Sequence, residues 1–441
     1  MTTTKLWKGE TEKAIRNFQI SGERVPTPVI RMLARLKAEA ARVNQELGGL
    51  DPDRAARIAA AADAVAAGEH DEQFPIDVFQ TGSGTSTNMN VNEVVATLAG
   101  DDVHPNDHVN LGQSSNDVFP SAVHLAALDA AERDLLPALE TLRRALEAKA
   151  AEFAEVVKPG RTHLMDAVPV TLGQEFAGYA AQVREGIARV RASLGRVGQL
   201  PLGGSATGTG LNAHPQFAAR VRERLAAATG LKLAPPAHPF EAQGARDALV
   251  ELSGALKTVA VSCTKIANDI RWMGSGPRAG LGELNLPELQ KGSSIMPGKV
   301  NPVMCEVLTQ VAAQVIGNDA AVTIGGLSGN FELNVYIPLM ARNLLQSIAY
   351  LAAASREFAA KCVDGISANA EHARHLAERT LVLVTALNPV VGYDEAAAIS
   401  KEAAATGRSL REVALAHGVS ADVLDKALDL RAMAHGNGFA G

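Results

Sequence analysis

Long stretches with helical periodicity constrain the fold of this chain more than any other feature. Apolar residues recur every three to four positions over five segments, 121–156, 174–197, 242–273, 302–324 and 337–362. Each segment is far longer than the average helix of about 11–12 residues, and each carries apolar residues on more than one face. Such helices must bury two faces, against neighbours within the chain and across subunits. We therefore predict a mainly α protein with a long central helical bundle, and an oligomer.

The composition of the 441-residue chain agrees with closely packed helices. Apolar residues make up 47%, many of them alanine, and aromatic residues make up only 4%, which suits helices better than a β-rich core. Changes of pattern along the chain predict three domains. A small N-terminal domain is expected at 1–113, a central helical-bundle domain at 114–366 and a small helical C-terminal domain at 367–441.

Charge and cysteine content argue against several classes of function. A net charge of −6 gives no electrostatic case for binding nucleic acid or an anionic membrane. The three cysteines are odd in number and far apart, which argues against a disulfide framework and for a reducing compartment. We expect Cys263 and Cys362 to lie in the core as small apolar residues.

No targeting segment or metal motif is predicted. No group of cysteines and histidines has zinc spacing, and the N-terminus lacks the apolar core of a signal peptide. No apolar run approaches the roughly 20 residues that span a bilayer. We therefore expect a cytoplasmic protein that needs no metal.

The most informative polar interruption is the segment 292–302, Gly-Ser-Ser-Ile-Met-Pro-Gly-Lys-Val-Asn-Pro. Gly292 and Gly298 allow backbone conformations that other residues avoid, and Pro302 suits the first turn of the next helix. The segment therefore reads as a polar loop that runs into a helix N-terminus, where free N–H groups favour a carboxylate or a developing oxyanion. Lys299 adds a positive charge and Asn301 both donates and accepts hydrogen bonds. An ordinary surface connector is the alternative.

Further polar segments interrupt the helical background in the way that a site would. Residues 81–94 place uncharged donors beside two glycines, 104–107 and 113–117 are rich in Asn, Asp and Ser, and 160–175 contains Arg-Thr-His. A glycine-rich patch at 202–212 lacks both the preceding strand and the later acidic residue of a dinucleotide fingerprint. Nucleotide binding is therefore not predicted.

In one register from about Leu6 to Ala434, these segments resemble the class II fumarase branch of the fumarase/aspartase superfamily. The 292–302 loop fits the superfamily pattern Gly-Ser-x-x-Met-x-x-Lys-x-Asn, and 81–93, 114–116 and 162–163 are similar to its other shared blocks. The resemblance implies a fumarase/aspartase-like fold in a homotetramer, with a central twenty-helix core and active sites shared between subunits. It implies no cofactor and no metal.

The activity implied by the resemblance is the reversible anti addition of water to fumarate, giving (S)-malate, the fumarate hydratase step of the tricarboxylic acid cycle. Aspartase has glutamine where this chain has His163, and Cys305-Glu306 after the loop is also similar to fumarase. Aspartate ammonia-lyase is the alternative enzyme. A third reading is an inactive structural relative of the kind that serves in the eye lens, and the intact catalytic residues named next argue against it.

The resemblance also implies a role for individual residues. Ser293 is the implied base that takes the carbon-bound proton, and His163 paired with Glu306 handles the proton of water or hydroxide. The residues implied to bind the substrate are Ser83, Gly84, Thr85, Ser114, Ser115, Asn116, Thr162, Ser294, Lys299, Val300 and Asn301.

A second dicarboxylate site is implied by the segment His104, Pro105, Asn106 and Asp107. A turn with Asn and Asp capping is the alternative reading of the same residues. Asp101 stands where relatives often carry an arginine. A carboxylate there would repel a dicarboxylate, which argues against occupancy of this second site.

Overall fold

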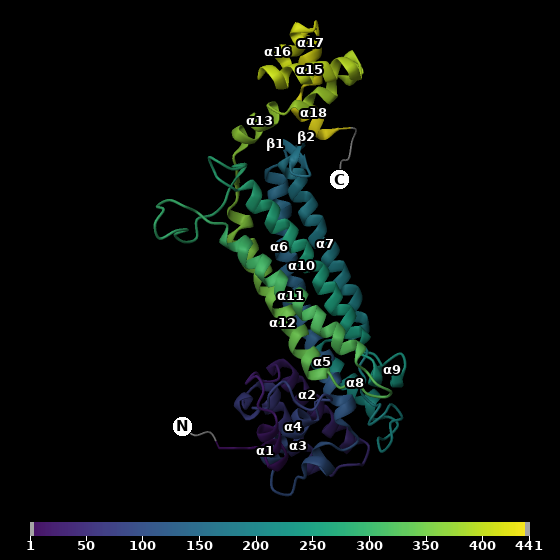
Figure 1. The fold of residues 1–441 in the computed structure, drawn as a ribbon. Coiled ribbons are helices and arrows are strands. Elements are labelled where there is room, and N and C mark those ends of the chain that lie inside the picture. Colours follow the sequence, from purple (N-terminus) through teal and green to yellow (C-terminus); the bar gives the residue numbers. More distant parts are fainter. Residues whose placement is uncertain (1–3, 437–441) are drawn as a thin grey trace. The chain divides into compact units, whose positions relative to one another are not determined.

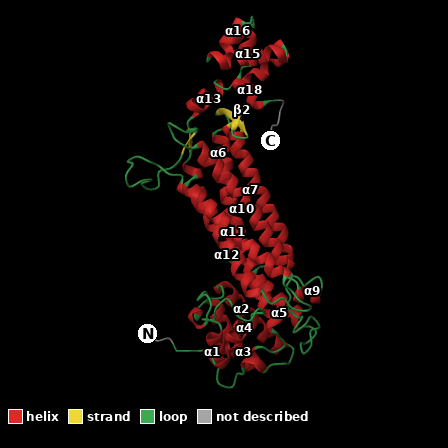
Figure 2. Ribbon diagram, viewed as in Figure 1, coloured by secondary structure: helices red, strands yellow, loops and turns green. Residues whose placement is uncertain are grey.

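The computed structural model describes residues 4–436, and they form a mainly α structure, which confirms the predicted fold class (Figures 1 and 2). The chain divides into two compact units, each assembled from three separate stretches. The first unit comprises Met1–Ala138, Gly186–Val261 and Val311–Ala353, and the second comprises Leu139–Glu185, Ser262–Gln310 and Ala354–Gly441. The division into three domains stays a prediction.

The first unit begins with short helices whose ends are fixed by local sequence. Asp51 caps α3 by accepting hydrogen bonds from the N–H groups of Asp53 and Arg54, Pro52 follows at the first helical position, and Gly68 ends the helix in the left-handed region. The elements that lie wholly in this unit are α1 (Gly9–Asn17), α2 (Thr27–Glu46), α3 (Pro52–Ala67), η1 (Asp71–Gln73), α4 (Thr85–Ala99), η2 (Pro105–Val109), α5 (Ser115–Ala130), η3 (Ala131–Leu135), α8 (Phe217–Thr229) and α9 (Pro239–Gly244).

Five long helices contribute residues to both units. They are α6 (Leu136–Glu152), α7 (Leu172–Val197), α10 (Asp247–Met273), α11 (Val303–Leu327) and α12 (Ile337–Lys361). They account for most of the predicted helical stretches. Within the first unit, buried Asp319 of α11 accepts hydrogen bonds from Ser253 (2.8 Å) and Lys257 (2.6 Å) of α10. Polar contacts therefore fix the register of neighbouring long helices.

Three predicted helix bounds are wrong for local reasons. The segment 121–156 is divided between α5, a π-helical turn and α6. The segment 242–273 is broken after Gly244, because a side chain there would lie 2.3 Å from the carbonyl oxygen of Phe331, so the backbone of another segment occupies that side of the chain. Pro302 precedes α11 rather than standing in its first turn, and its carbonyl accepts the N–H of Glu306.

The second unit contains a β-hairpin that the sequence analysis does not predict. β1 (Val157–Thr162) pairs antiparallel with β2 (Met165–Thr171), and the register shifts between Pro159 and Gly160. Two prolines and this irregularity hide the alternation that identifies a strand. The remaining elements of the unit are β3 (Leu284–Asn285), η4 (Val363–Gly365), β4 (Ser367–Ala368), α13 (Ala370–Glu378), η5 (Leu381–Leu387), α14 (Asn388–Val391), α15 (Tyr393–Thr406), α16 (Leu410–Ala416), α17 (Ala421–Ala427) and α18 (Leu430–His435).

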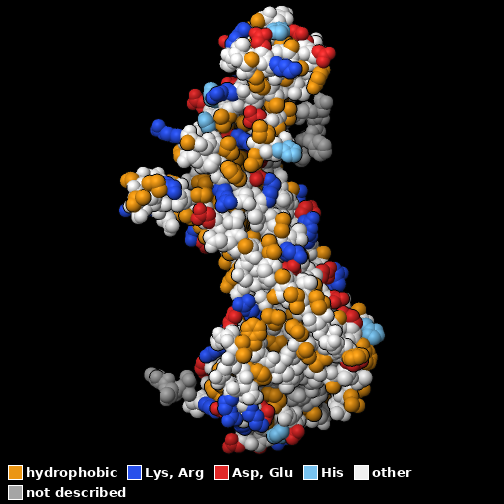
Figure 3. Space-filling view, in the orientation of Figure 1, with side chains coloured by type: hydrophobic (Ala, Val, Ile, Leu, Met, Phe, Trp, Pro, Cys, Tyr) orange, Lys and Arg blue, Asp and Glu red, His pale blue; other side chains and the backbone are white. Residues whose placement is uncertain are grey.

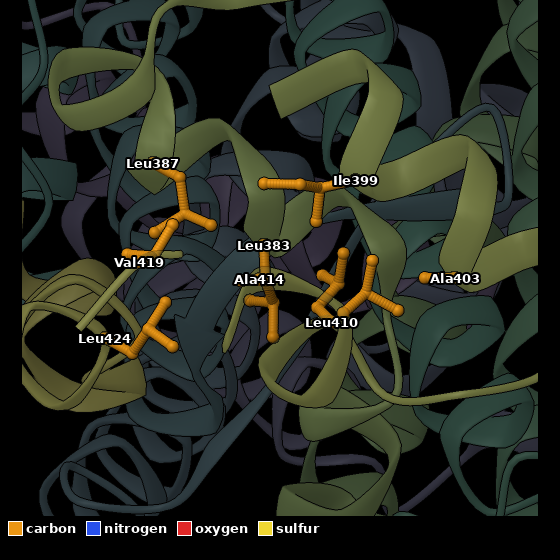
Figure 4. Close-up of a cluster of buried hydrophobic side chains, with 9 residues drawn as sticks. Leu383, Leu387, Ile399, Ala403, Leu410, Ala414, Val419 and Leu424 are labelled. Carbon is orange, nitrogen blue, oxygen red and sulfur yellow. The ribbon is translucent and has the colours of Figure 1, made fainter. Parts of the chain in front are cut away.

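The C-terminal helices of the second unit have a hydrophobic core of their own. Leu383, Leu387, Ile399, Leu410 and Leu424 are buried and point toward one another from η5, α15, α16 and α17 (Figure 4). At roughly 1.5–3 kcal/mol for each buried large side chain, this cluster stabilises the short helices, which would be marginal alone.

Candidate active site

The block at 114–116 sits at the capped start of α5 in the first unit. Ser114 caps the helix, and buried Asp117 accepts the N–H of Ser114 at 2.9 Å, which completes a capping box. The same carboxylate accepts the N–H groups of Gly203 (2.9 Å) and Ser205 (3.1 Å). Asp117 thus ties the glycine-rich patch at 202–212 to this block and holds the backbone of both.

A buried polar network lies beneath the same block. Lys37 of α2 donates to Asn110 (3.2 Å) and Gln113 (3.0 Å), and Asn88 of α4 donates to Asn110 (3.1 Å) and Ser115 (3.0 Å). Burial lowers the pKa of Lys37 to about 7 and raises the pKa of Asp117 to about 6. Buried polar groups that find partners specify one arrangement, so the block is held rigidly.

The block at 83–85 lies beside this network. Gly84 is in the left-handed region (φ 77°) just before α4, and a side chain there would lie 2.2 Å from the ring of Phe119 on α5. Only glycine allows so close an approach. The hydroxyl groups of Ser83 and Thr85 are 2.7 Å apart. The first unit therefore holds 83–85 and 114–116 close to one network of buried side chains, and their role in binding a ligand stays a prediction.

His163 stands at the tip of the hairpin in the second unit. His163 and Leu164 are the two central residues of the turn, and both have positive φ (57° and 61°), as in a type I′ turn. This conformation is unfavourable for a branched residue such as leucine. Thr162, His163 and Leu164 are all exposed, Leu164 by 71%. The strained turn therefore presents the imidazole on the surface of the chain.

A buried ion cluster holds the hairpin from below. Both terminal nitrogens of the Arg161 guanidinium donate to the fully buried carboxylate of Glu283, at 3.0 and 2.8 Å. Buried Lys158 donates to Glu175 (2.8 Å) and lies 3.5 Å from Glu283. Burial raises the pKa of Glu175. The cluster joins the base of the His163 turn to the chain that leads into the 292–302 loop.

The 292–302 loop closes on itself. Gly292 donates to the carbonyl of Lys299 (3.0 Å), and the amide of Asn301 donates to the carbonyl of Gly292 (2.8 Å). A side chain at Gly292 would lie 2.2 Å from the Lys299 oxygen, and Gly298 has φ 77°. Both glycines are therefore required.

The donors within this loop converge on one serine. The hydroxyl oxygen of Ser293 accepts the N–H groups of Ile295 (3.2 Å) and Met296 (3.0 Å). The residues around it are exposed, including Ser294, Lys299 and Val300, and Ile295 is 83% exposed. Figure 3 shows hydrophobic side chains gathered on the part of the chain that Figure 1 draws as a projecting loop before α11.

His163 and Glu306 do not meet within the described chain, where no hydrogen bond or ion pair joins them. Glu306 lies in the first turn of α11, partly buried. Next to it, Cys305 is fully buried and lies beside Cys362, and the contact with Cys305 and burial both raise the pKa of Cys362. All three cysteines are free and buried, so Cys263 and Cys362 lie in the core as predicted.

The segment at 104–107 has the geometry of a capped turn. The ring nitrogen Nδ1 of His104 accepts the N–H of Asp107 at 3.1 Å, and Nδ1 of His108 accepts the N–H of His104 at 2.8 Å. His104, Asn106 and Asp107 are exposed. The capping alternative thus describes the chain without ligand, and dicarboxylate binding there stays a prediction.

The residues that hold the blocks in place are not predicted from the sequence. Lys37 is distant in sequence from the block that it supports, and nothing in its helical surroundings marks it. Asp117 and Arg161 could have been found, because each directly follows or precedes a predicted site residue.

Within residues 4–436, no group of three or more His, Cys, Asp or Glu side chains could hold a metal ion. In the same range, no helix is long and apolar enough to cross a membrane.

Comparison with known proteins gives close matches over nearly the whole chain. A family described as "Lyase" matches residues 1–317, and one described as "Fumarase C C-terminus" matches residues 383–435. The class II fumarate hydratase of Mycobacterium tuberculosis is 58% identical over 438 residues, 97% of this chain and 92% of the relative. That of Corynebacterium glutamicum is 56% identical over 440 residues, 98% and 93% of the two chains. The crystal structure of class II fumarase from Schistosoma mansoni matches with a TM-score of 0.97 at 36% identity. The match covers 99% of this chain and 97% of the Schistosoma chain.

Proposed function

This chain belongs to the class II fumarase family, and on that premise we propose how its residues catalyse the reversible hydration of fumarate to (S)-malate. The activity is that of a hydro-lyase. The observation that carries it is the identity of 58% to a class II fumarate hydratase over 97% of the chain. The roles of individual residues, the shared site and the compartment are our proposals.

In the malate direction, the difficult step is removal of a proton from the carbon next to a carboxylate. The electron pair of the broken C–H bond moves into that carboxylate, which becomes a doubly charged aci-carboxylate. Donors that are already in place where charge develops usually make the largest catalytic contribution. Lys299, Asn301 and the N–H groups of the loop are suited to this task.

Ser293 is the proposed base. A hydroxyl group is a weak base unless its alkoxide is stabilised. The N–H groups of Ile295 and Met296 already point at its oxygen, at 3.2 and 3.0 Å, and Lys299 in the same loop adds positive charge. Hydrogen bonds to the charged form favour that form, so these contacts support the assignment.

His163 is the proposed acid on the other carbon. It protonates the departing hydroxide, which leaves as water with the electrons of the C–O bond. The electron pair held in the aci-carboxylate then forms the double bond of fumarate. A carboxylate beside an imidazole fixes its tautomer and raises its basicity, and Glu306 would supply that carboxylate. Thr85, Ser114, Ser115, Asn116, Thr162 and Ser294, with Ser83, Gly84 and Val300, would hold the two substrate carboxylates.

We propose that a homotetramer completes the site. Among residues 4–436 of one chain, no hydrogen bond or ion pair joins His163 to Glu306. In addition, α11 carries the exposed apolar residues Val307, Ile316, Ile324 and Leu327, the last 73% exposed. Apolar surface of this kind marks an interface between proteins. A second subunit that covers α11 could also bring Glu306 to His163 of another chain.

The shared site predicts that activity and the tetramer are lost together on dilution. Sedimentation and malate turnover measured over the same concentration range would check this. A stable monomer with full activity would contradict it.

The substrate test is turnover of malate and of aspartate by the purified protein, followed by ultraviolet absorbance of the fumarate that forms. Turnover of malate is expected. Activity on aspartate alone would favour aspartate ammonia-lyase, and no activity on either would favour an inactive relative.

Two further expectations stand as proposals. The reducing environment of the cytoplasm suits three free, buried thiols. The turn at 104–107 would serve as a second dicarboxylate site only if binding overcame the charge of Asp101.

A further inference from the structure

A pocket in the first unit contains a buried cation with unused hydrogen-bond donors. The pocket has a volume of about 420 Å³. Its lining includes His124 of α5, Arg196 and Gln199 at the end of α7, and the chain around Arg246 that joins α9 to α10. None of the site residues named above lines it.

Arg246 is only 2% exposed. One terminal nitrogen donates to the carbonyl of Ala242, but Nε and the other terminal nitrogen, Nη2, have no hydrogen-bond partner among the described residues. Burial lowers the pKa of Arg246 to about 10, so the guanidinium stays charged at neutral pH. Nearly all buried donors in proteins find a partner, and an uncompensated buried charge is strongly unfavourable. The two free N–H groups are therefore suited to bind an anion.

The start of α10 adds to this preference. The 27-residue helix begins at Asp247, directly after Arg246, and the N-terminal end of a helix carries free N–H groups and a partial positive charge. Both the helix and the guanidinium favour an oxyanion, whose oxygens can accept several N–H groups at once.

His124 supplies a different kind of group. Its Nδ1 lies 2.8 Å from the carbonyl oxygen of Val197, and a carbonyl can only accept, so Nδ1 carries the hydrogen. Burial lowers the pKa of His124 to about 4, so the ring is neutral and Nε2 is an acceptor. The pocket thus offers donors and an acceptor to the same ligand.

Charges in the lining limit the size of the anion's charge. Glu241 and Asp247 line the pocket, and neither forms an ion pair with Arg246 in the described chain. Arg196 is already paired with Glu251. Two unpaired carboxylates would repel a polyanion and can accept from an O–H group.

We propose that this pocket binds a small oxyanion of single charge that also carries a hydroxyl group, such as dihydrogen phosphate or a hydroxylated monocarboxylate. Its oxygens accept from Nε and Nη2 of Arg246, and its hydroxyl donates to an acceptor of the lining. The inference does not depend on the reaction proposed above.

The first test is thermal unfolding of the intact protein with phosphate, glycolate, acetate or chloride at equal ionic strength. Malate is avoided because it is the substrate. Phosphate and glycolate are expected to raise the unfolding temperature more than acetate, which lacks the hydroxyl, and chloride least. Arg246→Met is expected to lower the affinity for phosphate by about tenfold or more, the usual result of losing a charge-assisted hydrogen bond. The rise in unfolding temperature caused by phosphate should be smaller accordingly. Arg222→Met is the matched control, because Arg222 is partly buried in the same unit but does not line the pocket, and it should behave as the original chain.

The ligand-free variants separate binding from a structural role. Without phosphate, Arg246→Met should unfold at the same temperature as the original chain or higher, because it removes an unpaired buried charge. A large drop would mean that Arg246 already has its partners, which would overturn the proposal. Arg246→Lys keeps the charge but has fewer donors, and it should bind phosphate more weakly than the original chain does.

The second test is a crystal soaked with arsenate, which replaces phosphate and is located by anomalous scattering. A peak within hydrogen-bonding distance of Nε or Nη2 of Arg246 is expected. Water alone at that position would overturn the proposal. A peak in the crystal would count as an adventitious ion only if neither Arg246→Met nor Arg246→Lys changed phosphate binding in solution. That result would also overturn the proposal.

Discussion

The block at 114–116 and the loop at 292–302 differ in how they are held. The first is supported by Asp117, Lys37 and a buried set of amide side chains of the same chain. The second is exposed and makes its hydrogen bonds mainly to itself. Groups that bind the substrate carboxylates can be fixed in advance, whereas a loop that shelters a charged intermediate gains from being able to move.

This contrast predicts that substitutions separate into two classes. In the loop, they should change catalysis and leave stability alone. In the buried network, they should change stability and substrate binding together.

The largest effect is expected for Ser293→Ala. Loss of the base should lower kcat by about 10³-fold or more, while the free energy of unfolding changes by less than about 0.5 kcal/mol, since the residue is in an open loop. Steady-state kinetics and urea unfolding would measure both. Ser294→Ala is the matched control and should act mainly on KM. Full activity of Ser293→Ala would remove the assignment of the base.

Glu306→Gln should lower kcat by about 10- to 100-fold, the usual effect of removing a group that orients a catalytic residue. Its stability should stay close to that of the original chain. If kcat is unchanged, Glu306 does not act on His163 in any subunit. Loss of the proposed tetramer would instead assign Glu306 a structural role.

Asp117→Asn should destabilise the protein by about 2–3 kcal/mol, because three N–H groups lose a charged acceptor, and should raise KM. Asp129→Asn on the same helix is the control, since Asp129 makes only an exposed ion pair with Arg133, and it should change stability by less than about 0.5 kcal/mol. Equal effects of the two variants would mean that the 114–116 block is not held by Asp117.

The smallest effect concerns pH. Burial lowers the pKa of Lys37 from 10.5 to about 7, so between these values the unfolded chain holds a proton that the folded chain has released. The free energy of unfolding then rises with pH, by roughly 1 kcal/mol per pH unit. Relative to Lys37→Met, the original chain should gain stability between pH 7 and pH 9 in urea unfolding. A difference that does not change with pH would mean that Lys37 stays charged in the folded protein.

The same contrast explains how far sequence reasoning reaches. The long helices and the polar blocks are evident from periodicity and from short motifs, because the signal for each lies in neighbouring residues. In the 292–302 loop, Gly298 has the positive φ that the sequence predicts, whereas Gly292 is required by its close approach to the Lys299 carbonyl, which the sequence does not reveal.

What the sequence does not reveal depends on contacts between distant segments. Lys37 supports a block far along the chain, and Glu283 holds a hairpin whose strands are hidden by Pro159 and Pro169. Arg246 looks like any arginine at a helix start, and only the fold shows that it is buried without a full set of partners. Supporting residues of this kind require the three-dimensional structure.

The most direct test of the central claim, that each active site combines residues of different subunits, is complementation between inactive variants of His163 and Ser293. His163→Asn and Ser293→Ala would be unfolded together, refolded as mixed tetramers and assayed with malate. If each site takes these residues from different chains, random assembly leaves about one site in four intact, and activity should return to about that fraction of the original. If both residues of a site come from one chain, the mixture will stay as inactive as its parents, and the account of a shared site will be wrong.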